Sequence, residues 1–113
     1  MITRKDNQTT SIRERMRDGN GSAKLTALVG ELPANARLFS TITLEPGSSI
    51  GYHVHENETE LFYFASGYAR VRDDDEFYEM QPGDAMATFS GHGHAVESIG
   101  PGPLVLVACI IKD

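Results

Sequence analysis

Short β-like segments, separated by turn residues, follow one another from residue 22 to the end of the chain and limit the folds open to it. Residues 37–44 (RLFSTITL) and 60–65 (ELFYFA) are rich in β-branched and aromatic side chains, and residues 104–111 (LVLVACII) form an apolar run. Breaks rich in Gly, Pro and Asp lie between them, such as EPGSS, QPGD and GPGP. Short strands at this spacing are typical of sandwiches and barrels. The sequence therefore predicts an all-β domain of antiparallel strands.

The first 21 residues have a different character. Residues 10–17 form the only helix-like stretch, because Ile12 and Met16 lie four apart and the turn DGNG follows. We predict a short helix there. Residues 1–21 are too few to fold alone, and a β-sandwich must cover its open edges. We therefore expect an N-terminal arm over residues 1–21 that contributes to a homodimer interface, and a β-domain over residues 22–113.

Length, charge and cysteine content exclude several classes of protein. The 113 residues suit one domain. A net charge of -6 without a basic stripe argues against nucleic-acid binding, and no apolar run is long enough to predict a membrane span. The single cysteine, Cys109, lies in an apolar run and is predicted to be a buried core thiol, which fits a cytoplasmic protein.

The four histidines form two His-x-His pairs, His53 with His55 and His92 with His94. Because residues two apart in a strand point to the same face, His53 and His55 would present two imidazoles side by side. Imidazole is a common ligand of divalent transition metals. The first pair therefore marks a candidate metal site.

Glu60 supports this interpretation. It begins the next predicted strand and shares strand parity with Phe62 and Phe64, so its face of the strand is otherwise apolar. A carboxylate on such a face is costly to desolvate unless a cation compensates it. A metal ion bound by the histidine pair and Glu60 would supply that cation.

Two longer stretches resemble the two signatures of the cupin superfamily. Residues 47–67 are similar to the first signature, whose positions are filled by Gly47, His53, His55, Glu60 and Gly67. Residues 83–98 are similar to the second, with matches at Gly83, Gly91 and His94 and with Phe89 and Ser98 in place of Pro and Asn. The flanking sequence resembles small single-domain bacterial cupins, which are often labelled oxalate-decarboxylase-like or sugar-phosphate-isomerase-like.

The resemblance implies a fold and a cofactor. The fold would be a single cupin-type antiparallel β-barrel, also called a double-stranded β-helix or jelly roll. The cofactor would be one divalent transition-metal ion, with His53, His55, Glu60 and His94 as its ligands. Because three imidazoles and one carboxylate accept several metals, the ion could be Mn, Fe, Ni, Co, Cu or Zn.

Such a site indicates an enzyme that activates a small, oxygenated, anionic metabolite. Lyase or decarboxylase chemistry and isomerase chemistry lead, with dioxygenase chemistry next, because a bound metal polarises carbonyl and carboxylate groups. A carboxylate or an enediol-like molecule would be the ligand, since the ion leaves the site positively charged. The alternative is a non-catalytic, metal-dependent module that binds or senses a small ligand.

Further side chains are weaker candidates. His92 is a candidate acid or base or an alternative metal ligand, or else a loop histidine facing solvent. Phe62, Phe64 and Met86 are candidates for lining a substrate pocket, although core packing explains them equally well. Arg37 is a candidate for binding a substrate carboxylate, or for a surface ion pair. Glu58 is expected to be a solvated loop carboxylate.

Overall fold

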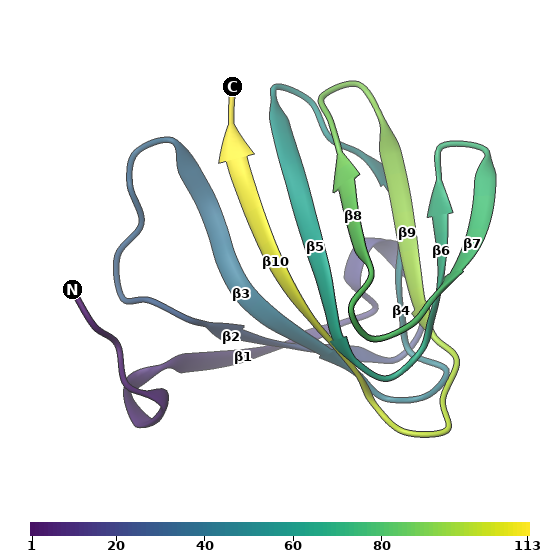
Figure 1. Cartoon of the computed structure of the whole chain (residues 1–113), viewed down its shortest axis with the longest axis horizontal. Helices are drawn as coiled ribbons and strands as arrows, with labels where there is room; N and C mark the ends of the chain where they lie inside the picture. The colour runs from purple at the N-terminus through teal and green to yellow at the C-terminus, as the bar shows by residue number, and fades with distance from the viewer.

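Two antiparallel β-sheets make up the chain in the computed structural model, which describes residues 1–113 (Figure 1). The six-stranded sheet has the order β1-β2-β3-β10-β5-β8, and the four-stranded sheet has the order β4-β9-β6-β7. Every strand pair is antiparallel. The prediction of an all-β antiparallel domain is confirmed.

The strands are short, as the spacing of turn residues predicts. Their bounds are β1 (Thr9–Glu14), β2 (Ser22–Ala27), β3 (Ala36–Leu44), β4 (Ser49–Val54), β5 (Glu58–Ser66), β6 (Ala69–Asp73), β7 (Glu76–Met80), β8 (Ala85–Thr88), β9 (Gly93–Ser98) and β10 (Leu104–Lys112). Two 3₁₀ helices of three residues each, η1 (Lys5–Asn7) and η2 (Met16–Asp18), lie near the N-terminus. With three residues each, neither of these helices could span a membrane.

The inner faces of the two sheets form one apolar core. Side chains alternate between the two faces of a strand, so β10 buries Leu104 and Leu106 while their neighbours face outward. Phe64 of β5 is fully buried, and the four-stranded sheet contributes Val71 and Val96. Burying these side chains holds the sheets face to face, and strands of both sheets carry the candidate ligands described below.

The N-terminal segment does not form the helix expected over residues 10–17. Instead, β1 pairs with β2 along the edge of the six-stranded sheet, from Thr9 opposite Ala27 to Glu14 opposite Ser22. Strand pairing is favoured over the weak helical pattern, because it satisfies the hydrogen-bonding groups of the β1 backbone. Beyond β1, η2 begins at Met16.

The segment that contains η2 packs closely against β4. Gly51 lies so near the segment that a Cβ atom placed there would be 2.0 Å from the carbonyl oxygen of Arg17. A Cβ at Gly19 would be 2.2 Å from the carbonyl oxygen of Ser49. The backbone N–H of Ser49 also donates to the Asn20 carbonyl at 2.8 Å. Glycine is needed at both positions because the two backbones touch.

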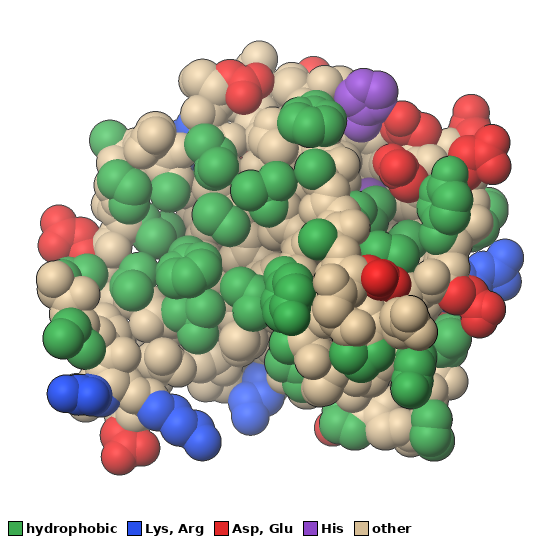
Figure 2. All heavy atoms as spheres, in the orientation of Figure 1, with side chains coloured by type: hydrophobic (Ala, Val, Ile, Leu, Met, Phe, Trp, Pro, Cys, Tyr) green, Lys and Arg blue, Asp and Glu red, His purple; other side chains and the backbone are tan.

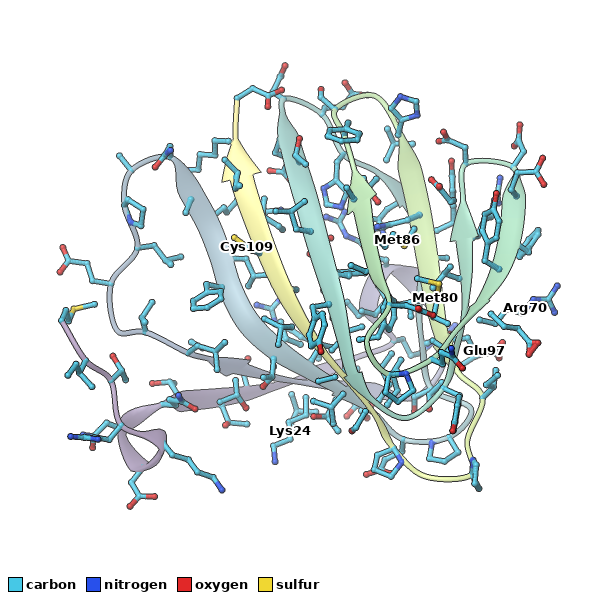
Figure 3. The ribbon with its side chains drawn as sticks, viewed as in Figure 1. Lys24, Arg70, Met80, Met86, Glu97 and Cys109 are labelled. Carbon is cyan, nitrogen blue, oxygen red and sulfur yellow. The ribbon has the colours of Figure 1, made fainter.

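Cys109 is half-buried on the outer face of the six-stranded sheet, so the prediction of a core thiol is wrong (Figure 3). Its neighbours Ala108 and Ile110 point into the interior instead, as the alternation along β10 requires. Hydrophobic side chains gather over β3, β10 and β5 on this outer face (Figure 2). The apolar run at residues 104–111 thus contributes side chains to both the inner and the outer face of β10.

Candidate metal centre

Four side chains from both sheets converge at one point between them. His53 lies on β4, His55 directly follows β4, and His94 lies on β9, all in the four-stranded sheet or at its end. Glu60 comes from β5 of the six-stranded sheet. One nitrogen or oxygen atom from each of these residues lies within 4.8 Å of the others. Antiparallel pairing of β4 with β9 places His53 directly opposite His94.

The atoms that face one another are the Nε2 atoms of the imidazoles and one carboxylate oxygen. His94 Nε2 lies 3.1 Å from His55 Nε2 and 3.2 Å from His53 Nε2. Glu60 Oε1 lies 2.9 Å from His55 Nε2 and 3.1 Å from His94 Nε2. His55, Glu60 and His94 are at most 5% exposed, and His53 is half-buried. The cluster is therefore largely screened from bulk water.

Each imidazole has a different partner on its Nδ1 side. His53 Nδ1 donates to the Gly51 carbonyl at 2.8 Å, and His55 Nδ1 donates to Glu58 Oε2 at 2.7 Å. His94 Nδ1 lies 2.7 Å from the hydroxyl oxygen of Thr88, which can accept its proton. A proton on Nδ1 leaves the Nε2 lone pair free, so these partners turn the lone pairs toward the centre.

Glu58 also binds Arg37 and so links His55 to the surface. Arg37 Nε donates to Glu58 Oε1 at 2.9 Å, and Arg37 Nη2 donates to Glu58 Oε2 at 2.7 Å. The hydrogen bond from Arg37 is the main cause that lowers the pKa of Glu58 to about 2, and the same contact raises the pKa of Arg37. Glu58 is therefore ionised at neutral pH and accepts the His55 proton.

Burial lowers the pKa of His53 to about 4, because an imidazolium is poorly solvated there. The hydrogen bond to Gly51 opposes this shift, while electrostatic interactions with His94, Arg17 and His55 lower the pKa further. His53 is consequently neutral at pH 7, and a neutral imidazole is the form that binds a metal.

The donor set fits a divalent ion. Several lone pairs and one carboxylate face one another with no cationic side chain between them, an arrangement that repels unless a cation lies among them. Two ligand atoms about 2.1 Å from an ion and at right angles to each other lie about 3.0 Å apart. The observed contacts of 2.9–3.2 Å match that separation.

A cavity of about 470 Å³ opens beside the cluster, and His53 and Glu60 line it. Its apolar walls come from eight side chains: Ile12, Met16, Leu25, Leu38, Ile42, Ile50, Phe62 and Ile110. The ring of Phe62 stacks on His94, with centroids 4.9 Å apart and planes 14° apart. A small molecule could therefore reach the four converging side chains through a chamber that both apolar and charged side chains line.

The structure brings together only some of the weaker candidates. Phe62 and Arg37 line the cavity. Arg37 also forms an ion pair with Glu58, as the second interpretation of this residue expected. Phe64 is fully buried in the core, and Met86 packs against that core and lines an outer hollow (Figure 3). Neither Phe64 nor Met86 lines the cavity beside the histidines.

His92 points away from the metal centre. Its ring is exposed, and Nδ1 lies 2.6 Å from Asp74 Oδ2. The hydrogen bond to Asp74 raises the pKa of His92. An acid or base role for His92 stays a prediction that this geometry does not support, since the ring does not line the cavity.

Sequence reasoning missed two partners of the ligands. Glu58 belongs to β5 and contacts His55, so the interpretation as a solvated loop carboxylate is wrong. Its strand parity with Glu60 was a usable signal, because both side chains leave the same face of β5. Thr88 is 1% exposed and lies opposite Glu60 in the β5–β8 ladder, a long-range pairing that no local pattern predicts.

Known proteins resemble this chain in sequence and in fold. It is 34% identical to an oxalate-binding protein of Thermotoga maritima, over 98% of this chain and 93% of that protein. A crystal structure of a predicted oxalate decarboxylase from Thermotoga maritima superposes with a TM-score of 0.94 and 33% identity, covering all of both chains. Oxalate decarboxylase OxdC of Bacillus subtilis is 36% identical over 64% of this chain, which corresponds to 20% of that longer protein.

These likenesses agree with the architecture described above. The two antiparallel sheets match the jelly-roll fold of the Thermotoga maritima structure, which confirms the predicted fold class. The family model for the cupin domain matches residues 40–110, a range that contains the four converging side chains. The chain belongs to the cupin family.

Proposed function

We propose that this protein binds a small carboxylate through a divalent transition-metal ion held by His53, His55, Glu60 and His94. The observation that carries this proposal is the convergence of three imidazole nitrogens and a carboxylate oxygen within 4.8 Å beside a cavity. When bound, the ion would act as a Lewis acid toward carboxylate or carbonyl oxygens. The similarity to an oxalate-binding protein supports a small carboxylate as the ligand class.

The chain's own residues would prepare the site for such an anion. Gly51, Glu58 and Thr88 fix the rings so that their Nε2 atoms face inward. Phe62 covers one face of His94 and keeps water from it. A divalent ion with one carboxylate ligand leaves the site positively charged, which favours an anion despite the acidic net charge of the chain.

Calorimetric titration of oxalate into metal-loaded and metal-free protein tests the proposal. We expect saturable binding of about one oxalate per metal-loaded chain, and loss of binding by at least about 100-fold after chelation or in Glu60→Gln. Equal oxalate affinity with and without metal would contradict the proposal. The Glu79→Gln variant, which changes a carboxylate of β7 outside the cavity, serves as the control.

A catalytic function is the second candidate, as a lyase or decarboxylase, or as an isomerase. The position of Glu14 supports a catalytic function, because this carboxylate lines the cavity. Both of its oxygens lie 2.9 Å from the hydroxyl of Ser22, which is their only hydrogen-bond partner. A carboxylate with free lone pairs can accept or return a proton. Turnover of a panel of keto and hydroxy acids by metal-loaded protein, lost in Glu14→Gln, would support catalysis. Binding without turnover for each candidate metal would leave the binding function alone.

We also propose a homodimer. Phe39, Leu61, Tyr63 and Ile111 are between 37% and 51% exposed and lie on neighbouring strands of the six-stranded sheet. Such contiguous apolar surface is a common feature of protein interfaces. The free edge of β1 would extend the contact and so involve the N-terminal arm. Light scattering should give twice the chain mass of 12.4 kDa, and a monomer mass would contradict the dimer.

We place the protein in the cytoplasm. Cys109 is its only cysteine and is a free thiol on the outer face of the sheet. A reducing compartment preserves such thiols. Fractionation of cells of the source organism, followed by detection of the chain with an antibody, tests this placement, and recovery outside the cytoplasmic fraction would contradict it.

A further inference from the structure

Three arginines of the N-terminal arm border the cavity of the metal centre. Every residue from Ile12 to Arg17 lines this cavity, and Arg13, Arg15 and Arg17 alternate along the segment. All three are exposed, whereas Glu60 is 5% exposed. The arginines therefore lie on the solvent side of the cavity and the metal ligands lie on its buried side.

None of the three arginines forms an ion pair within the chain. The arginine pairs in the structure are Arg37 with Glu58 and Arg72 with Asp75. Two acidic residues lie next to these arginines in sequence: Glu14 accepts a hydrogen bond from Ser22, and Asp18 forms no ion pair. Arg13, Arg15 and Arg17 thus keep their donors free for a ligand, while Arg37 is already neutralised by Glu58.

The backbone holds two of these arginines, Arg15 and Arg17, in an uncommon conformation. Arg15 has a φ of 48° and Arg17 a φ of 54°, both in the left-handed region that non-glycine residues rarely adopt. The contact of Gly51 with the Arg17 carbonyl and a 2.8 Å hydrogen bond from Arg15 N–H to the Gly21 carbonyl maintain it. Rare backbone conformations of this kind concentrate at binding sites, where the surrounding structure stabilises them.

The cavity is also larger than oxalate needs. Pockets of about 300–1,000 Å³ hold ligands of drug-like size, and this cavity has about 470 Å³. Its eight apolar wall residues suit hydrocarbon, which oxalate lacks because its two carboxylates are joined directly. Three chemistries therefore meet in one chamber: metal ligands, an apolar wall and unpaired guanidinium groups.

We propose that the ligand of this protein is a dianion in which a hydrocarbon spacer separates the metal-binding carboxylate end from a second carboxylate, and that Arg15 and Arg17 bind the second carboxylate. Arg13 adds positive charge at the same border of the cavity. Guanidinium groups bind carboxylates through paired hydrogen bonds, which makes arginine well suited to this role. The inference rests on the proposed metal-dependent binding of a carboxylate.

A matched pair of ligands tests the second contact. 2-Hydroxyglutarate and 2-hydroxyvalerate share an α-hydroxy acid end and a five-carbon chain, but only the former has a second carboxylate. We expect metal-loaded protein to bind 2-hydroxyglutarate at least about 10-fold more tightly in calorimetric titrations at low ionic strength, with a smaller difference in high salt.

Variants assign the preference to the arm. Arg15→Met and Arg17→Met keep much of the side-chain length, and each should reduce the preference for 2-hydroxyglutarate over 2-hydroxyvalerate. Arg4→Met removes the same charge from the N-terminal segment outside the cavity and should keep the preference. Circular dichroism and metal content confirm that each variant is folded and loaded.

The outcomes separate this inference from the proposed function. If metal-loaded protein binds oxalate and binds both hydroxy acids equally, the proposal of a dianion with a hydrocarbon spacer is wrong. The proposal of metal-dependent carboxylate binding then stands. An undiminished preference in Arg15→Met combined with Arg17→Met would likewise overturn the assignment to these arginines. If neither metal nor oxalate binds, the proposed function fails and takes the inference with it.

Discussion

Each imidazole of the candidate metal centre is oriented by an acceptor of a different strength. His53 donates to a backbone carbonyl, His55 to an ionised carboxylate, and His94 lies beside a hydroxyl. A carboxylate acceptor raises the basicity of the ring most, because it stabilises positive charge that develops on a metal-bound imidazole. Among the three rings, His55 is therefore the one whose metal affinity depends most on its partner.

Replacing Glu58 tests this dependence. Glu58→Gln retains an oxygen that can accept the His55 proton but removes the negative charge and the ion pair with Arg37. We expect the metal affinity to fall by about 10- to 100-fold, as measured by competition with a chromophoric chelator. Glu31→Gln, a change in the exposed loop after β2, should leave the affinity unchanged. An unaltered affinity in Glu58→Gln would show that the contact is only structural.

The low pKa of His53 predicts how the stability of the metal-free protein changes with pH. Because its pKa is about 4 in the folded chain and near 6.5 when unfolded, the unfolded state binds more protons between these values. The free energy of unfolding should therefore fall as the pH falls from about 6.5 to about 4.

Urea denaturation at intervals across this pH range measures the effect. His53→Gln should show a shallower decline than the unsubstituted chain, since the substituted side chain does not titrate. Glu58 acts in a different window: its lowered pKa of about 2 means that its contribution to stability is lost only below about pH 4.5. Identical slopes for both proteins above pH 4.5 would contradict the account of His53.

At the scale of the elements, the contact between η2 and β4 positions the arm beside the cavity. The two backbones meet at Gly19 and Gly51. Gly51 lies two residues before His53 on the same strand. Because β4 also carries a ligand and pairs with β9, displacing the arm would disturb both the arginines and the metal centre. Part of the arm therefore forms a wall of the cavity, although its strand β1 is exposed along its length.

A methyl group at Gly51 tests this packing. Gly51→Ala would place a Cβ atom 2.0 Å from a backbone oxygen, so the arm must move away from β4. We expect a loss of about 1–3 kcal/mol in the free energy of unfolding by urea denaturation, and faster proteolysis near residues 15–19. Gly30→Ala meets no atom within 4 Å and should change stability by less than about 0.5 kcal/mol.

Sequence patterns predicted the strands well and the arm poorly. Turn residues and the period-2 alternation of β5 and β10 are local signals. The candidate ligand set came from the resemblance to the two cupin signatures. The helix predicted over residues 10–17 is wrong because β1 pairs with β2, and β2 lies outside the stretch of sequence in which a helical pattern is sought. Thr88 was missed for the same reason, since its contact with His94 depends on how β8 and β9 are arranged in the fold.

For the whole molecule, the metal centre would act as a cross-link between the two sheets. Glu60 belongs to the six-stranded sheet, and the three histidines belong to the four-stranded sheet or its end. An ion bound to all four residues would oppose separation of the sheets, because unfolding must release it.

Thermal unfolding with and without metal measures this effect. At a free metal concentration of about 1,000 times the dissociation constant, binding adds about 4 kcal/mol to the free energy of unfolding. For a domain of this size, that gain corresponds to a rise of about 15 °C in Tm. Chelation should reverse the shift, and Glu60→Gln should show little of it. Equal melting temperatures for loaded and chelated protein would contradict the cross-link.

Metal content of two histidine variants tests the central claim most directly. Elemental mass spectrometry of protein prepared without a polyhistidine tag should find one ion per chain. The His92→Gln variant should retain this ion, because His92 faces Asp74 and not the cluster. His94→Gln should lose it, because His94 Nε2 lies at the centre of the cluster. Retention of a full equivalent by His94→Gln, or loss of metal from both variants alike, would contradict the assignment of these ligands.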